Sequence, residues 1–448
     1  METAQRLPAP HSLEAVARRL AVLVGAVALL AVFLAAGAVL SRNPLPTVVV
    51  LAVGVGLLGT LWLALARYHA AVALGVLLFA AVRLEPAPAD LVFAVVIAVA
   101  FVTGRFAFDR VPLGVTVLVS AFLALNLLAS IEVIDAARAV QFFAITLYLG
   151  VFGLWLTSYV CSVQRARLVL VAYVTAAVVS AGIACLALFL PLPAREAFVD
   201  GPRAQGLFKD PNVFGPFLVP AALILIEEIV APRLLRLHLL TKLVFLSVVT
   251  LGVLFSFSRA AWLNLAVGAG VLLVVLLLRR GGARKAMTML AVGLLAAAAL
   301  FAAVSVTSSG GFLHERASLQ VYDVERFGTQ LSGLDLAAQY PLGIGPGQFE
   351  RVSELSAHST YVRALAEEGV LGALVLLALM LLTLGFAARN AAVGRSTYGI
   401  GSAALLAAWC GLLANSLFID TLHWRHLWLL AALIWAGTAL RAGYPSRY

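Results

Sequence analysis

The chain has 448 residues, of which 63% are hydrophobic and only 12% are charged. Soluble proteins carry about 25% charged residues, so this composition excludes a soluble globular fold and indicates a membrane protein. The three cysteines lie in or beside apolar segments, which argues against a disulfide framework.

Apolar segments recur along the whole chain, and a spanning helix needs about 20 apolar residues. The first segment is longer than the apolar region of a signal peptide and lacks a clear cleavage site, so we expect a retained helix. Two segments, 69–83 and 90–103, are short enough to be re-entrant. The sequence predicts an all-α polytopic membrane protein with 12–14 transmembrane helices in a single domain, 1–448. The segments are 20–40, 46–66, 69–83, 90–103, 112–130, 136–160, 166–190, 213–231, 240–257, 260–278, 286–306, 360–387, 399–418 and 425–440.

The charges of the connecting segments predict the orientation. If both termini are cytoplasmic, 19 of the 31 Lys and Arg residues but only five of the 21 Asp and Glu residues lie inside. This asymmetry follows the positive-inside rule. The net charge of +10 therefore reflects orientation in the membrane and gives no reason to expect nucleic-acid binding. The expected partners of the helices are membrane lipids.

Two stretches on the opposite, outer side are longer than turns. They are a smaller loop, 191–212, and a large loop, 306–360. Loops of the second size are usually functional. Within it, ERFGTQLSGLDLAAQ has apolar residues at helical spacing, so we expect the loop to be partly helical.

Three residues on this side could carry chemistry: Arg203, Arg259 and His358. Each also has a structural explanation. Arg203 could pair with Asp200 or Asp210, Arg259 could extend to the headgroups, and His358 could serve only as a hydrogen-bonding residue. Together they suit a phosphate-bearing substrate and a hydroxyl nucleophile, because arginine forks bind phosphate oxygens and an imidazole can accept a hydroxyl proton.

Two carboxylates follow His358 at Glu367 and Glu368. They lie about 14–15 Å further along a helix that begins at the histidine, too far for a simple dyad. We expect them to support Arg363, four and five residues earlier, or an arginine from another loop.

The order of short motifs resembles the O-antigen ligase and O-antigen polymerase superfamily of bacterial inner membranes, and within it the O-antigen ligases. The motifs are R-x-x-G-x-F-x-x-P-N, S-R-A-A-W, PLGIGPGQF, and H-S-T-Y followed by E-E-G-x-x-G. They span roughly 200–372, and each is weak alone. The residues of this region that could take part in a site are Arg203, Asn212, Ser258, Arg259, His358, Tyr361, Arg363, Glu367 and Glu368.

The resemblance implies an inverting glycosyltransferase of the C-type membrane fold that needs no metal or other cofactor. Such ligases transfer a glycan from undecaprenyl diphosphate to lipid A–core at the periplasmic face. By this resemblance Arg203 and Arg259 would bind the diphosphate, and His358 would activate the acceptor hydroxyl. The family commonly has Asn after the histidine, where this chain has Ser359.

Alternatives remain open. Within the superfamily they are an O-antigen polymerase and a protein O-oligosaccharyltransferase. A transporter is the alternative from another class, although we find no internal repeat of the kind that transporters often show. Glu227 and Glu228 stand apart from the site, near the cytoplasmic end of their helix, where we expect them to face Arg233 or the headgroups.

Overall fold

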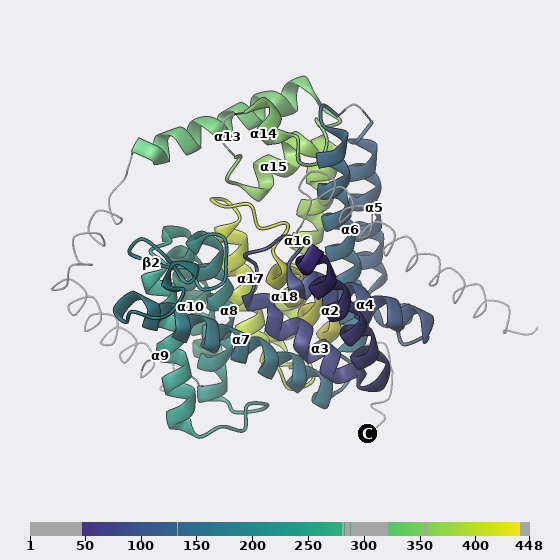
Figure 1. The fold of residues 1–448 in the computed structure, drawn as a ribbon. Coiled ribbons are helices and arrows are strands. Elements are labelled where there is room, and N and C mark those ends of the chain that lie inside the picture. The colour runs from purple at the N-terminus through teal and green to yellow at the C-terminus, as the bar shows by residue number, and fades with distance from the viewer. Residues whose placement is uncertain are drawn as a thin grey trace, which may run out of the picture.

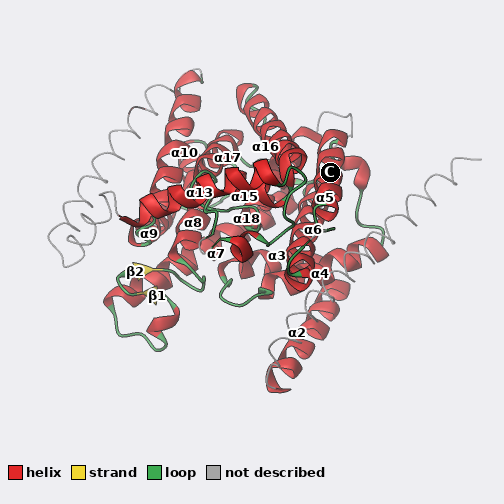
Figure 2. Cartoon of the chain, turned by 90° about the horizontal axis from the view of Figure 1, so that it is seen from above, coloured by secondary structure: helices red, strands yellow, loops and turns green. Residues whose placement is uncertain are grey.

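The computed structural model describes residues 47–131, 133–279, 282, 287, 321–353 and 356–439. The predicted helix 20–40, the predicted helix 286–306 apart from residue 287, and the first part of the large loop lie outside these residues. The described chain is mostly helical, and its helices form a bundle crossed at one end by α13 and α15 (Figures 1 and 2).

Most of the helices follow the predicted apolar segments. In chain order they are α2 (Thr47–Ala66), α3 (Tyr68–Leu77), α4 (Pro88–Val102), α5 (Leu113–Leu128), α6 (Ala136–Tyr159), α7 (Val163–Phe189), α8 (Pro211–Val230), α9 (Leu239–Phe255), α10 (Arg259–Leu278), α13 (Val321–Gln339), α14 (Phe349–Val352), α15 (Thr360–Glu367), α16 (Gly369–Ala392), α17 (Ser402–Asn415) and α18 (Arg425–Ala439). Within the described ranges, five of them are long and apolar enough to cross a membrane: α6, α7, α8, α10 and α16.

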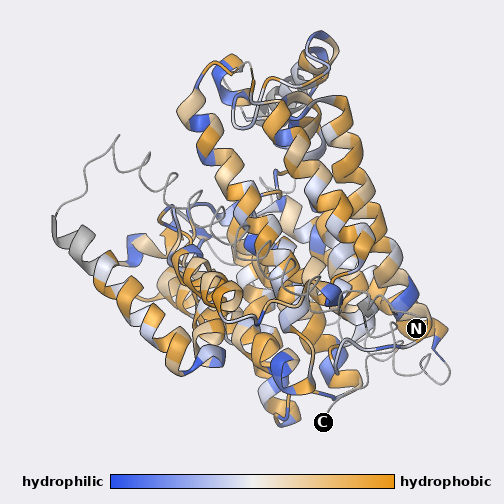
Figure 3. Ribbon diagram, turned by 90° about the vertical axis from the view of Figure 1, so that its right-hand side faces the viewer, coloured by the Kyte–Doolittle hydropathy of each residue, from blue (hydrophilic) through white to orange (hydrophobic). Residues whose placement is uncertain are grey.

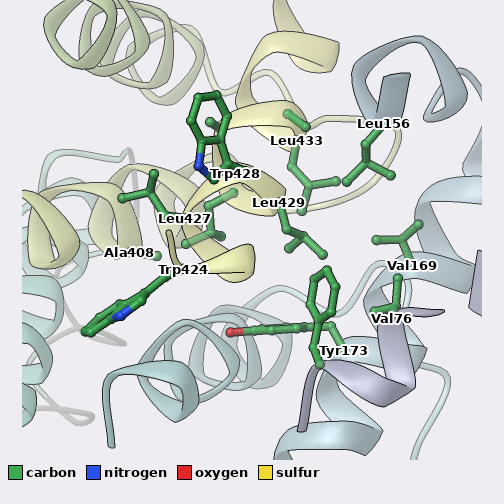
Figure 4. Packing of buried hydrophobic residues seen from close by; sticks show 14 of the residues in the cluster. Val76, Leu156, Val169, Tyr173, Ala408, Trp424, Leu427, Trp428, Leu429 and Leu433 are labelled. Carbon is green, nitrogen blue, oxygen red and sulfur yellow. The ribbon is translucent and has the colours of Figure 1, made fainter. Parts of the chain in front are cut away.

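The centre of the bundle is formed by helices that are apolar on all sides. Leu429 and Leu433 of α18 are buried against side chains of neighbouring helices, including Val169 and Tyr173 of α7 (Figure 4). Peripheral helices instead expose large apolar side chains, such as Leu374 of α16. Figure 3 shows how far the apolar residues extend along the helices. An outward apolar face is what lipid contact requires, since the surrounding acyl chains are themselves apolar.

The smaller loop contains a feature that the sequence did not predict. Its residues form a short helical turn at Arg195–Ala197 and a two-stranded antiparallel hairpin of β1 (Val199–Asp200) and β2 (Arg203–Ala204). The hairpin is too short to show the alternating apolar pattern that predicts strands.

The predicted single helix 360–387 is wrong, because the structure divides it into α15 and α16. Gly369 has φ +72°, and a Cβ added there would lie 2.4 Å from the carbonyl oxygen of Pro341. Only glycine accepts this conformation and this approach readily. The Val370 amide then donates to the Pro341 carbonyl (3.0 Å), which ties the break to the large loop. The partly helical character predicted for that loop is confirmed by α13.

Candidate functional site

Arg203 is held at the start of α8 by the hairpin. Its Nε donates to the carbonyl oxygen of Ser256 (2.9 Å), and its Nη2 donates to Oδ1 of Asn212 (2.9 Å). Asp210 caps α8 by accepting from the Asn212 amide (2.7 Å). Gly206 has φ +57°, and a Cβ there would lie 2.6 Å from the Ser180 hydroxyl. The glycine of the first motif therefore allows the turn that carries Arg203 to pack against α7.

Arg259 begins α10, next to the segment that holds Arg203. Ser258 is the N-cap of this helix, since its hydroxyl accepts from the Ala261 amide (3.4 Å), and Arg259 is the first helical residue. The preceding turn packs closely against α8, because a Cβ added at Gly215 would lie 2.6 Å from Oγ of Ser256. Through Ser256, whose carbonyl accepts from Arg203, the two motifs meet at one place although 56 positions separate their arginines.

His358 immediately precedes α15 and is half-buried, with φ +47°. A non-glycine residue in this conformation is uncommon and is often held in place at a functional site. Here the Thr360 amide donates to the Ser416 carbonyl (2.9 Å), and the Tyr361 hydroxyl donates to the Leu413 carbonyl (3.0 Å). The end of α17 therefore fixes the segment that carries His358.

The packing of α10 on α17 brings Arg259 and the segment that carries His358 to the same level of the bundle. A Cβ at Gly411 would lie 2.3 Å from Oδ1 of Asn264, and one at Gly268 would lie 3.2 Å from the Ala407 carbonyl. These pairings define an antiparallel register. It places Arg259, five residues before Asn264, level with Ser416, five residues after Gly411. Ser416 also binds the start of α15, so Arg259 and the His358 segment share one end of α17.

Arg363 is the hub of a buried ionic network behind His358. Its Nη1 lies 3.2 Å from Oε1 of Glu367, its Nε lies 3.1 Å from Oδ2 of Asp420, and its Nη2 pairs with Glu350. Burial works against the charge of this guanidinium, but the three carboxylates raise the pKa of Arg363 above its ordinary value, so it remains protonated. Ser356 accepts a further hydrogen bond from Nη2 (2.9 Å).

Glu367 joins this network to the glycine-rich turn of the large loop. Its Oε2 accepts from the Gly347 amide (2.8 Å), and its Oε1 accepts from the Phe349 amide (3.0 Å). Burial raises the pKa of Glu367 to about 7, while Arg363 and the two amides oppose that rise. The PLGIGPGQF segment is thus a structural turn that one carboxylate secures against α15.

Among the described residues, Glu368 forms no ion pair with Arg363, whose partners are Glu350, Glu367 and Asp420. Its Oε1 accepts from Nδ2 of Asn126 on α5 (3.0 Å). Burial, followed by the adjacent Glu367, raises the pKa of Glu368 well above its ordinary value. The two glutamates therefore have different partners: Glu367 supports Arg363, and Glu368 joins α5 to the start of α16.

A protonated Glu368 predicts a specific dependence of stability on pH. The folded state then retains a proton that the unfolded state releases above the ordinary glutamate pKa of about 4.3, so the free energy of unfolding falls as pH rises above that value. The substitution Glu368→Gln keeps a neutral group with an acceptor for Asn126. We expect thermal unfolding in detergent to change little at pH 5 and the decline between pH 5 and 8 to become shallower. An unchanged pH slope in the Glu368→Gln variant contradicts this protonation state.

The sequence reasoning missed the segment between α17 and α18. It supplies Asp420 to the Arg363 network, and its His423 has Nε2 3.0 Å from the Thr146 hydroxyl of α6. Burial lowers the pKa of His423, which keeps the imidazole neutral. The sequence feature that could have indicated this segment is the polar string DTLHWRH, which lies between two apolar helices on the same predicted side as His358.

Ion pairs also join the large loop to the start of α6, and the sequence did not predict them. Arg138 pairs with Glu350 (2.8 Å) and Arg351 with Asp135 (2.5 Å). The partners are more than 200 positions apart, so no local pattern could have related them.

These features define a helical membrane protein whose arginines and one strained histidine gather at one end of the bundle. Residues 243–377 match the family model described as O-antigen ligase. The match supports the resemblance to the O-antigen ligase and polymerase superfamily seen in the motifs, over this part of the chain. The matched segment includes Arg259, His358 and Arg363 with its partners Glu350 and Glu367, whereas Arg203 lies before it and Asp420 after it. No curated protein matches the chain significantly.

Proposed function

We propose that the protein is an O-antigen ligase. It transfers the glycan from undecaprenyl diphosphate to the outer-core sugar of lipid A–core at the periplasmic face of the bacterial inner membrane, with both termini in the cytoplasm. The observation that carries this proposal is the packing of Arg203 and Arg259 at adjoining helix starts, level with the segment of His358. The match of residues 243–377 to the O-antigen ligase family model supports the same class of reaction.

The arginines suit the leaving group of this reaction. A diphosphate departs readily once its developing charge is stabilised, and fixed cations in a water-poor site provide that stabilisation. Arg203 is oriented by Ser256 and Asn212, and Arg259 starts α10, where the positive end of the helix dipole adds to its charge.

His358 supplies the proton transfer. The acceptor hydroxyl oxygen attacks the anomeric carbon of the donor sugar while the bond from that carbon to the diphosphate oxygen breaks. The hydroxyl proton passes to the His358 imidazole, and the diphosphate leaves with the bonding electron pair toward the arginines. Attack opposite the leaving group inverts the anomeric centre.

The glycolipid profile of a strain that lacks the gene tests this assignment. Loss of a ligase leaves bare lipid A–core while polymerised glycan accumulates on undecaprenyl diphosphate, and the plasmid-borne gene restores the attachment. Loss of an O-antigen polymerase instead leaves core that carries a single repeat unit. A normal glycolipid profile with altered modification of proteins would indicate a protein O-oligosaccharyltransferase, and no glycan change at all would favour a transporter.

Activity is expected to survive removal of divalent cations, because the arginines take the place of a metal at the diphosphate. Purified protein with donor and acceptor should retain its rate in excess EDTA. A metal-dependent glycosyltransferase in the same buffer is the control and should lose activity. A clear loss by the present protein, with recovery on adding Mg²⁺ or Mn²⁺, refutes the metal-independent mechanism.

A further inference from the structure

An open cavity of about 460 Å³ lies between the end of α8 and the start of α9. Its polar lining comes from Arg233, Arg236 and Lys242, and its apolar lining includes Leu237 and Leu239. Since α8 has 20 residues, this cavity is about 30 Å from Asn212 at the other end of the helix. It is thus separate from the site of Arg203 and His358.

Hydrogen bonds hold the backbone that lines the cavity. Buried Glu228 accepts hydrogen bonds from the amides of Arg233 (3.1 Å), Leu234 (3.0 Å) and Leu235 (3.1 Å). Lys242 lies 3.6 Å from the Glu228 carboxylate and donates to the Glu228 carbonyl (2.9 Å). Four donors therefore hold the connection in one conformation, and the charge of Lys242 is already compensated.

The two arginines of the cavity are not compensated in this way. Arg233 and Arg236 are exposed, and within the described part of the chain neither guanidinium is paired with a carboxylate. Glu227, the remaining acid at this end of α8, pairs with Arg279 (3.1 Å). The cavity therefore presents two positive charges to an anion, and guanidinium groups match phosphate oxygens in geometry as well as charge.

An apolar surface continues from the cavity along the outside of α9. Leu240 is 72% exposed, and Leu239, Leu243 and Val244 are also exposed. A free phosphate would make no use of this surface, whereas acyl chains would cover it. Basic pockets between helices at the membrane surface are a recurrent way to bind anionic headgroups.

We propose that this cavity binds an anionic phospholipid, with its phosphate between Arg233 and Arg236 and its acyl chains on the exposed leucines of α9. The site does not depend on glycan transfer. It would fix the α8–α9 connection to the membrane at the end of the bundle opposite the candidate active site.

Native mass spectrometry of the full-length protein with added phosphatidylglycerol or phosphatidylcholine tests the proposal. We expect the wild-type protein to retain phosphatidylglycerol preferentially. The double substitution Arg233→Ala and Arg236→Ala should weaken that binding about 25-fold, since each basic residue near an anionic surface contributes about fivefold. The double substitution to Lys should retain part of the affinity and guards against a folding defect.

The matched control removes two exposed arginines elsewhere at the same end of the bundle, Arg389→Ala with Arg395→Ala. This control should bind phosphatidylglycerol as the wild type does. An equal loss in control and cavity variants would show general surface attraction and overturn the proposal. Equal retention of phosphatidylcholine would also overturn it. Displacement of the lipid by an equal concentration of soluble glycerol phosphate would show that the site takes a free phosphate ester instead.

Discussion

Replacement of His358 by alanine should reduce glycan attachment to lipid A–core by about 10²–10⁴-fold, the usual contribution of a general base. The acceptor hydroxyl would then attack without a group to take its proton. Rates should be measured with purified protein, separated donor and acceptor, and protein amounts matched by immunoblot of the membrane fraction. Normal attachment by the variant would refute the catalytic role.

The backbone at His358 allows a sharper form of this experiment. Its φ of +47° is tolerated better by Asn than by most residues, so His358→Asn preserves the turn and a polar side chain but removes the base. We expect His358→Asn to unfold at the wild-type temperature and to be as inactive as His358→Ala. His238→Ala, at an exposed histidine at the other end of the bundle, should leave the rate unchanged. Substantial activity in the Asn variant would mean that His358 acts through hydrogen bonding alone.

Most helix positions could be predicted from composition, because lipid demands long apolar segments. The prediction of 136–160 agrees with α6 (Ala136–Tyr159) to within a residue. The same criterion joined α15 to α16, since hydropathy does not register the left-handed conformation at Gly369 or its contact with Pro341. Both depend on the large loop folding back against the helix.

For the candidate site, the sequence predicts which residues take part but not how they are arranged. The individual residues Arg203, Arg259 and His358 could be selected from the sequence because charged groups are rare in this chain. Their arrangement could not, because it depends on the register of α10 against α17, which is fixed by close packing at Gly411 and Gly268. The partnership of Arg363 with Asp420 likewise follows from tertiary packing.

Replacement of either proposed diphosphate-binding arginine should also lower the rate of glycan transfer strongly. Arg203→Ala and Arg259→Ala are each expected to lower the rate about 10²–10³-fold, as for loss of one preorganised donor to a developing anion. Lys should restore only part of the rate, because an ammonium lacks the planar fork. Arg195→Ala, which removes an exposed arginine from the same loop as Arg203, should leave the rate near that of the wild type.

Arg203 and Arg259 can be distinguished by their surroundings. The guanidinium of Arg203 is already oriented by Ser256 and Asn212, so Asn212→Ala should reproduce part of the Arg203→Ala defect without changing any charge. If Arg203 only held the hairpin against α8, Arg203→Ala would lower the unfolding temperature, and the protein that remained folded would keep its rate. If Arg203 binds the diphosphate, its loss should raise the KM for the donor and lower kcat while the KM for the acceptor stays the same. A defect confined to the acceptor would therefore move the arginine from the leaving group to the nucleophile and overturn this part of the mechanism.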